Sequence, residues 1–177
     1  SLIDVVNDFG ALSEKSEEIY INAILRKELP KLEEAAEGAA ADADARQNDY
    51  DVFLTSFKEL LCQSQIFVRE VNHGERSVVS MRDIARAARV FKWFLTYYSK
   101  LRGVASIGVS DDKDGVMRLS ISEDMKPHLR TAVILTLGYC YHSRLNRDQR
   151  WAYRKRLCDT WKKMMSENPQ VEWLRLD

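Results

Sequence analysis

Apolar residues recur three and four positions apart over long stretches of this chain, and that is the period of an amphipathic α-helix. In residues 51–71 the repeat is carried by Phe53, Phe57, Leu60, Leu61, Phe67, Val68 and Val71. Only 7 Gly and 3 Pro occur among the 177 residues, so the chain has few of the turn residues on which all-β folds depend. The sequence therefore predicts an all-α fold, with residues 1–177 forming a single helical domain, a bundle of about five helices.

The first helix is expected to begin near Ser13, a plausible N-cap, and to end near Pro30. Its apolar stripe is predicted to consist of Ile19, Tyr20, Ala23 and Ile24. Residues 31–49 follow, rich in Ala, Glu and Asp and almost without large apolar side chains. A helix there would have nothing to bury. We interpret 31–49 as a flexible acidic insertion (solvated segment, frayed helix or disordered linker); an acidic partner-binding segment is the alternative.

The last two helices flank a short turn near residue 145. The fourth is expected to start near Ser122, or at Pro127 if that residue takes the first helical position. Because it is apolar nearly all round, we expect it at the centre of the bundle. The fifth follows Asn146 and ends before Pro169, and residues 170–177 either dock on the bundle or lead into another domain. A long loop over residues 102–122, with a turn at 111–115 and a small hairpin as one possibility, connects the third and fourth helices.

Net charge is zero, but it is unevenly distributed: residues 1–51 carry −8 and residues 52–177 carry +8. Such a split favours charge that is solvated or paired within one assembly, and it disfavours nucleic acid as the partner. No apolar run approaches the roughly 18 residues of a membrane span, and no signal-peptide pattern is visible. The three cysteines, Cys62, Cys140 and Cys158, form no C-x-x-C motif, so we expect buried thiols in a reducing, cytoplasmic protein.

Enzyme motifs are absent from the sequence. The chain has no phosphate-binding loop, no dinucleotide fingerprint, no nucleophile elbow and no H-E-x-x-H, and its three His are too scattered for a zinc site. Cys140 and His142 are two residues apart, which places them on different faces of a helix. We therefore expect no catalytic residue and no metal site in this chain.

The third predicted helix, over residues 80–101, carries the one positive signal. Ser80 and Asp83 form an approximate capping box, and Ile84, Ala88, Phe91, Leu95 and Tyr98 share its apolar face. Arg82 lies in the first turn, where the helix dipole favours an anion and a guanidinium can hold a phosphate with two hydrogen bonds. The plainer interpretation is that Arg82, Arg86 and Arg89 form the solvated face of an amphipathic helix.

Four stretches in order resemble one family and cover roughly half of the chain. SVVSMRDIARAARVFKWF resembles the S-x-R-D-x-x-R signature that opens the lid helix of AAA+ ATPases, particularly in the mysterin family of giant ring-finger ubiquitin ligases and more loosely in midasin and dynein. DVVNDFGALSEKSEEIYINAIL, LLCQSQIFVREV and LGYCYHSRLNRDQRWAYRKRL are similar to further segments of that family. Asn7 departs from the pattern, since the family often has Trp there, and 31–49 resembles no family segment.

The resemblance implies that the chain is the helical lid of an AAA+ module in a larger polypeptide. By this analogy Arg82 is the sensor 2 arginine that reaches the γ-phosphate of ATP, and Arg86 is its neighbour at the seam with the core or the next subunit. ATP and Mg²⁺ would be held by the core, so this chain alone binds no cofactor and is no enzyme, while the whole protein would be an ATPase and an E3 ubiquitin ligase. Its partners would be the AAA+ core and neighbouring modules. The alternative from another class is a non-enzymatic helical interaction module whose basic face binds an acidic partner or RNA.

Overall fold

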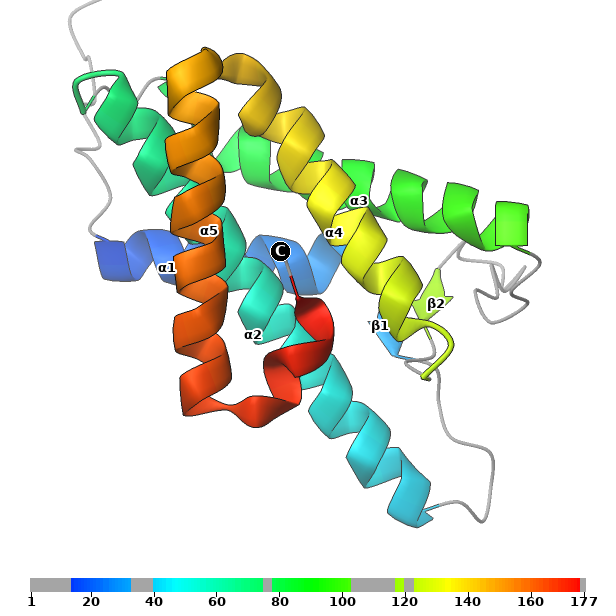
Figure 1. The fold of residues 1–177 in the computed structure, drawn as a ribbon. Coiled ribbons are helices and arrows are strands. Elements are labelled where there is room, and N and C mark those ends of the chain that lie inside the picture. Colours follow the sequence, from blue (N-terminus) through cyan, green and yellow to red (C-terminus); the bar gives the residue numbers. More distant parts are fainter. Residues whose placement is uncertain (1–13, 33–39, 75–77, 103–116, 120–122, 176–177) are drawn as a thin grey trace, which may run out of the picture.

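The structure is a computed structural model that describes residues 14–32, 40–74, 78–102, 117–119 and 123–175. Within these residues the chain is an all-α bundle, as predicted (Figure 1). The α-helices are α1 (Glu14–Glu28), α2 (Ala40–Val71), α3 (Met81–Arg102), α4 (Lys126–Cys140) and α5 (Arg147–Glu167). Two 3₁₀ helices, η2 (His142–Arg144) and η3 (Pro169–Leu174), and two short strands, β1 (Lys31–Leu32) and β2 (Arg118–Leu119), complete the order.

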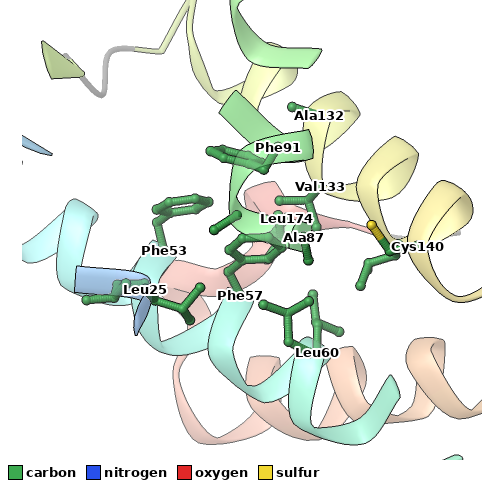
Figure 2. Packing of buried hydrophobic residues seen from close by; sticks show 14 of the residues in the cluster. Leu25, Phe53, Phe57, Leu60, Ala87, Phe91, Ala132, Val133, Cys140 and Leu174 are labelled. Atoms are coloured by element: carbon green, nitrogen blue, oxygen red, sulfur yellow. The ribbon is translucent and has the colours of Figure 1, made fainter. Parts of the chain in front are cut away.

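The long helix α2 is the centre of the bundle, and α1, α5 and η3 pack directly on it. Its Phe53 and Phe57 are fully buried, and both rings meet Phe91 of α3, with centroids 5.5 and 5.1 Å apart. Figure 2 shows α1, α3, α4 and η3 contributing to the same core through Leu25, Ala87, Phe91, Ala132, Val133, Cys140 and Leu174. The apolar period of residues 51–71 is thus the sequence signature of the central helix.

Helix α4 is not central, which corrects the prediction from its apolar composition. One face is buried, through Leu129, Ala132, Val133, Thr136, Leu137 and Cys140. On its other faces Ile134 and Tyr139 are 43% and 55% exposed. The helix begins at Lys126 with Pro127 in its first turn, so Pro127 rather than Ser122 marks its start. An apolar composition all round therefore does not mean that a helix is surrounded by protein.

Helix α1 buries a different face from the one predicted. Ile21, Leu25 and Leu29 are buried, whereas Ile19 and Tyr20 are 69% and 54% exposed. The buried face belongs to the common core, and an ion pair to α2 lies beside it: Glu17 receives two hydrogen bonds from Arg69, at 2.5 and 2.9 Å. Glu17 lies one helical turn before Ile21 on the same face, so the pair is consistent with Ile21 facing inward and Ile19 outward.

Helix α2 begins at Ala40, eleven residues before the predicted start, so the second part of the 31–49 segment is helical. Three contacts hold this end: Tyr50 Oη donates to the carbonyl of Pro30 at 2.9 Å, Asn48 Nδ2 donates to Gln170 Oε1 at 3.0 Å, and Lys126 lies 3.4 Å from Asp49. Ala, Arg and Gln are good helix formers, which allows the extension without an apolar face. Residues 33–39 lie outside the described residues, and the flexibility of 31–49 stays a prediction.

The predicted loop over residues 102–122 is shorter in the structure, because α3 continues to Arg102 and β2 occupies Arg118–Leu119. β2 pairs in parallel with β1, Lys31 opposite Arg118 and Leu32 opposite Leu119. This pair was not predicted, and it gives Leu119 a fully buried position. The predicted turn at 111–115 lies outside the described residues.

The predictions for the end of the chain are confirmed over the described residues. Asn146 caps α5 in a capping box with Gln149, the two hydrogen bonds measuring 2.9 and 3.0 Å. After α5, η3 folds back onto the bundle and buries Val171 and Leu174. Trp161 Nε1 donates to the carbonyl of Val171 at 3.3 Å, which ties η3 to α5. The tail docks rather than extends away (Figure 1).

Candidate functional site

The predicted nucleotide-sensing residues lie at the head of α3, and this head is firmly attached to α2. Gln65 of α2 donates to the carbonyl of Ser80 at 3.0 Å, and Arg69 donates to the carbonyl of Val79 at 3.3 Å. The adjacent Ile84 is fully buried. The position of the first turn of α3 is therefore fixed by buried and half-buried contacts on the side that faces the bundle.

Asp83 caps the helix and also connects it to the turn between α4 and α5. Its Oδ2 accepts a hydrogen bond from the backbone N–H of Ser80 at 2.8 Å, which is the reverse half of the predicted capping box. Its Oδ1 lies 2.7 Å from Arg144 NH2. Burial acts to raise the pKa of Asp83, but the Ser80 N–H and Arg144 outweigh it, so the pKa lies below its ordinary value.

Arg82 projects into solvent beside this anchored carboxylate. Its side chain is exposed, and it has no ion-pair or hydrogen-bond partner among the residues that the structure describes. It lies in the first turn of a 22-residue helix, at the positive end of the dipole. The side chain is thus available to an anion, whereas its neighbour Asp83 is fully engaged.

Arg86 lies one turn further along the same face and packs differently. Its guanidinium is 5.6 Å from the centroid of the Tyr139 ring, a cation–π contact with α4. Arg86 is exposed, as Arg82 is, so the two form an open basic surface. The structure brings them to one face of one helix, where Arg86 also contacts α4 through Tyr139.

Basic and aromatic side chains continue along the same exposed face of α3. Arg89 and Trp93 are both exposed. The Trp93 ring stacks on that of Tyr97, with centroids 5.5 Å apart and planes inclined by 9°. We call Arg82, Arg86, Arg89, Trp93 and Tyr97 the α3 stripe; these residues share the exposed face of the helix, with two aromatic rings at its far end.

The cysteines and histidines do not form a reactive site in the described part of the chain. Cys140 is buried, and burial raises the pKa of its thiol, whereas Cys62 and Cys158 are half-buried, so the prediction of three buried thiols is right only for Cys140. His142 follows α4 in η2, and its ring lies 6.1 Å from that of Tyr153. No group of three or more His, Cys, Asp or Glu side chains in the described residues is arranged to hold a metal ion.

Sequence reasoning did not single out Arg144 and Tyr139, whose side chains contact Asp83 and Arg86 of α3. Both occur in LGYCYHSRLNRDQRWAYRKRL, and Asp83 and Arg86 occur in SVVSMRDIARAARVFKWF. The two segments that resemble one family thus meet in space, through the Arg144–Asp83 ion pair and the Arg86–Tyr139 contact. The resemblance of both segments to one family, in the same order along the chain, was the sequence signal that could have pointed to these two residues.

None of the helices in the described residues combines the length and the apolar character that a membrane crossing requires.

By sequence the chain is 32% identical to the human E3 ubiquitin-protein ligase RNF213 over 155 residues, which is 88% of this chain and 2% of that protein. It is 25% identical to the mouse E3 ubiquitin-protein ligase RNF213 over 154 residues, 87% of this chain and again 2% of the relative. The chain therefore corresponds to a small part of these relatives. No family model matches it, and no solved structure does.

Proposed function

From the relationship of the chain to RNF213, a member of the mysterin-like family of giant E3 ubiquitin-protein ligases, we propose that it is the helical lid of an AAA+ module in such a protein. In this role it closes over ATP that the core of the module holds and transmits the effect of hydrolysis to neighbouring modules. The core would supply the phosphate-binding loop and the Mg²⁺ site, and this chain would supply an arginine.

One observation carries the proposal: Arg82 is exposed in the first turn of α3 and has no partner among the described residues, while the turn around it is fixed. A cation that must meet a phosphate from another domain needs both properties, a free side chain and a rigid base. Ser80, Asp83 and Arg144 supply the rigid base.

The coupling from this site into the bundle is proposed to run through Arg144. Closing on a phosphate pulls on α3, and α3 is joined to the turn between α4 and α5 by the Asp83–Arg144 ion pair. Arg86, held over Tyr139, would lie at the seam with the core or with the next subunit. The lid would therefore move as one body, which suits an element that transmits motion.

The test is substitution of Arg82 in the whole protein. Removing a charge-assisted contact to the γ-phosphate in a partly dehydrated site costs about 2–4 kcal/mol, so Arg82→Ala is expected to reduce ATP-dependent closure or turnover by about 30- to 1,000-fold. Arg82→Lys should restore only part of this, because an ammonium does not bridge two phosphate oxygens. Nucleotide affinity and steady-state hydrolysis are the two measurements, affinity being the one to use if this module binds ATP without hydrolysing it.

Arg89→Ala is the matched control, since Arg89 is on the same exposed face about two turns further along α3. It is expected to leave nucleotide affinity and turnover within about twofold, as for an ordinary surface substitution. Equal and small effects of the Arg82 and Arg89 substitutions would show that the α3 stripe is a solvated face and that the sensor role is wrong.

A second candidate is favoured by the far end of the α3 stripe. Exposed arginines followed by a stacked pair of aromatic rings, Trp93 and Tyr97, are the combination with which helical surfaces bind acidic partners or RNA. If this is the function, Trp93→Ala and Arg89→Ala weaken binding of a polyanion to the isolated chain as strongly as Arg82→Ala does. A lid would instead lose function mainly at Arg82.

A further inference from the structure

A groove lies between α4 and α5, on a part of the surface that the proposed lid function does not use. The two helices meet at η2 and diverge from there (Figure 1). The groove has a volume of about 450 Å³ and is partly open to solvent. Ile134, Leu137 and Gly138 of α4 line one wall, and Arg154, Leu157 and Cys158 of α5 line the other.

The spacing of these residues matches what a third helix would contact. On each wall the lining side chains are three and four residues apart, the spacing with which helices present one face to a neighbour. Ile134 is 43% exposed, and Cys158 is half-buried. Leu137 and Leu157 are nearly buried and form the floor of the groove, so Ile134 is its exposed apolar side chain. The groove thus has an apolar floor between two helices, the form in which a further helix can be bound.

Gly138 of α4 provides a second observation in favour of a segment that packs in this groove. Glycine inside a helix is less stable than alanine by about 1 kcal/mol, so a structural reason for it is expected. None is found among the described residues, because a Cβ added at Gly138 would meet no atom within 4 Å. A glycine that this chain itself does not need fits a position where the backbone of another segment comes close.

The charge of the groove indicates the nature of its occupant. Arg154 lines it, is exposed, and has no ion-pair partner in the described part of the chain. Burial lowers the pKa of His142, another lining residue, and the charges of Arg150 and Arg154 lower it further, so both arginines act on the groove. An occupant with carboxylates along its edge would neutralise them.

We propose that the α4–α5 groove binds an amphipathic helix of a partner polypeptide, with small or branched apolar residues facing Gly138 and acidic residues facing Arg154. The groove does not include Arg82 or Arg86, so this inference is independent of the proposed function. A second copy of this chain and a small apolar molecule are the other occupants that the test distinguishes.

The experiment titrates the full 177-residue chain with two labelled helical peptides of about 14 residues, which share an apolar face of Leu and Ala and differ in having Glu or Lys beside it. The Glu peptide is expected to bind about tenfold more tightly than the Lys peptide. Binding should also slow the reaction of Cys158 with a thiol reagent. Cys158 is the thiol to follow, because Cys140 is buried and burial raises the pKa of Cys62 to about 12.

Three variants locate the site. Leucine is a better helix former than glycine, so the Gly138→Leu chain is expected to stay folded. Its side chain would fill the groove, so peptide affinity should fall at least about tenfold. Ser166→Leu adds the same side chain at an exposed position two turns beyond Cys158, and it should leave the affinity unchanged. Arg154→Glu should abolish the preference, because one acidic residue would then balance Arg150, so that the two peptides bind about equally.

The proposal is overturned if neither peptide binds, if both bind equally, or if Gly138→Leu has no effect on the affinity while the variant remains folded by circular dichroism. Concentration-dependent self-association of the chain in sedimentation experiments, lost in Gly138→Leu, would identify a second copy as the occupant and would also overturn it. Protection of Cys158 by the Glu peptide, absent with the Lys peptide, is the positive result.

Discussion

Asp83 shows how a single side chain connects three parts of this fold. Its carboxylate accepts the backbone N–H of Ser80 and pairs with Arg144, 61 residues later in the sequence. Because the side chain is only 18% exposed, both interactions take place in a partly dehydrated environment. The carboxylate therefore holds the first turn of α3, from which the exposed Arg82 projects.

Asp83→Asn is expected to lower the free energy of unfolding at pH 7 by about 1–2 kcal/mol, because the amide cannot replace a charge-assisted acceptor. The pKa of Asp83 is lowered in the folded state from an ordinary value of 3.8. The contribution is therefore fully present well above pH 3.8 and is lost as the pH falls through the lower folded-state pKa. Urea unfolding of both proteins at pH 7 and pH 3 measures this, and the difference in stability between them should be smaller at pH 3.

Asp159→Asn serves as the control, since Asp159 is an exposed carboxylate on α5. Its substitution should change the stability by less than about 0.5 kcal/mol at either pH. A difference between wild type and Asp83→Asn that persists unchanged at pH 3 would show that the ion pair is not its source.

At the scale of elements, the short 3₁₀ helix η3 packs against the central helix α2. Leu174 is fully buried, Val171 nearly so, and the ring of Trp173 lies 6.3 Å from that of Phe53. Six residues of 3₁₀ helix have little stability of their own, so this packing must hold them. η3 thereby closes the side of the core between α2, α4 and α5.

Leu174→Ala should reduce the free energy of unfolding by about 2–4 kcal/mol, because it removes buried methyl groups and leaves a cavity. Glu172→Ala, an exposed position in the same 3₁₀ helix, should cost less than about 0.5 kcal/mol. Chemical denaturation of both variants measures the contrast. Equal stabilities would mean that the tail does not contribute to the core in solution.

The first turns of α2 are the element with the least apolar support. From Ala40 to Asp49 the helix has no large apolar residue, and ordering each residue costs about 1–2 kcal/mol of conformational entropy. We predict that residues 31–49 are the most mobile internal segment. Limited trypsin digestion should therefore cut after Arg46 before it cuts within 84–101 or 129–145. Equal resistance of the three regions would contradict this assignment.

At the scale of the molecule, the exposed arginines Arg82 and Arg86 at the head of α3 belong to a chain that is only part of a larger arrangement in its relatives. It corresponds to about 2% of its relatives' length. Since the sequence has no phosphate-binding loop, Arg82 alone would offer ATP one exposed charged contact, worth about 1 kcal/mol or less. The function we propose therefore requires the rest of the module.

The isolated chain is accordingly expected to bind ATP no more tightly than a millimolar dissociation constant and to hydrolyse none of it. Isothermal titration calorimetry with ATP and Mg²⁺ checks the first expectation, and phosphate release checks the second. The same titration on the Arg82→Ala chain sets the background. A micromolar site on the isolated chain would contradict the assignment of the phosphate-binding groups to another part of the protein.

The features that the sequence determined by itself depend on interactions between residues close together in the chain. Helix positions follow from a period of 3.6 residues, and Asn146, Pro127 and Asp83 act at helix starts through hydrogen bonds or backbone geometry within four residues. Such interactions depend on neighbours in the chain, so they can be predicted without knowing the fold. For the same reason the exposed arginines of the candidate site could be named in advance.

Only the tertiary structure decided which faces are covered and which distant residues meet. Apolar side chains on two faces of α1 are equally compatible with a helix, and packing in the core buries the one that contains Ile21 and Leu25. Similarly, the composition of α4 does not say which of its faces is covered, and the structure places no atom within 4 Å of a Cβ added at Gly138 among the described residues. The partner of Asp83 is 61 residues away, and a period of three or four residues carries no information at that distance.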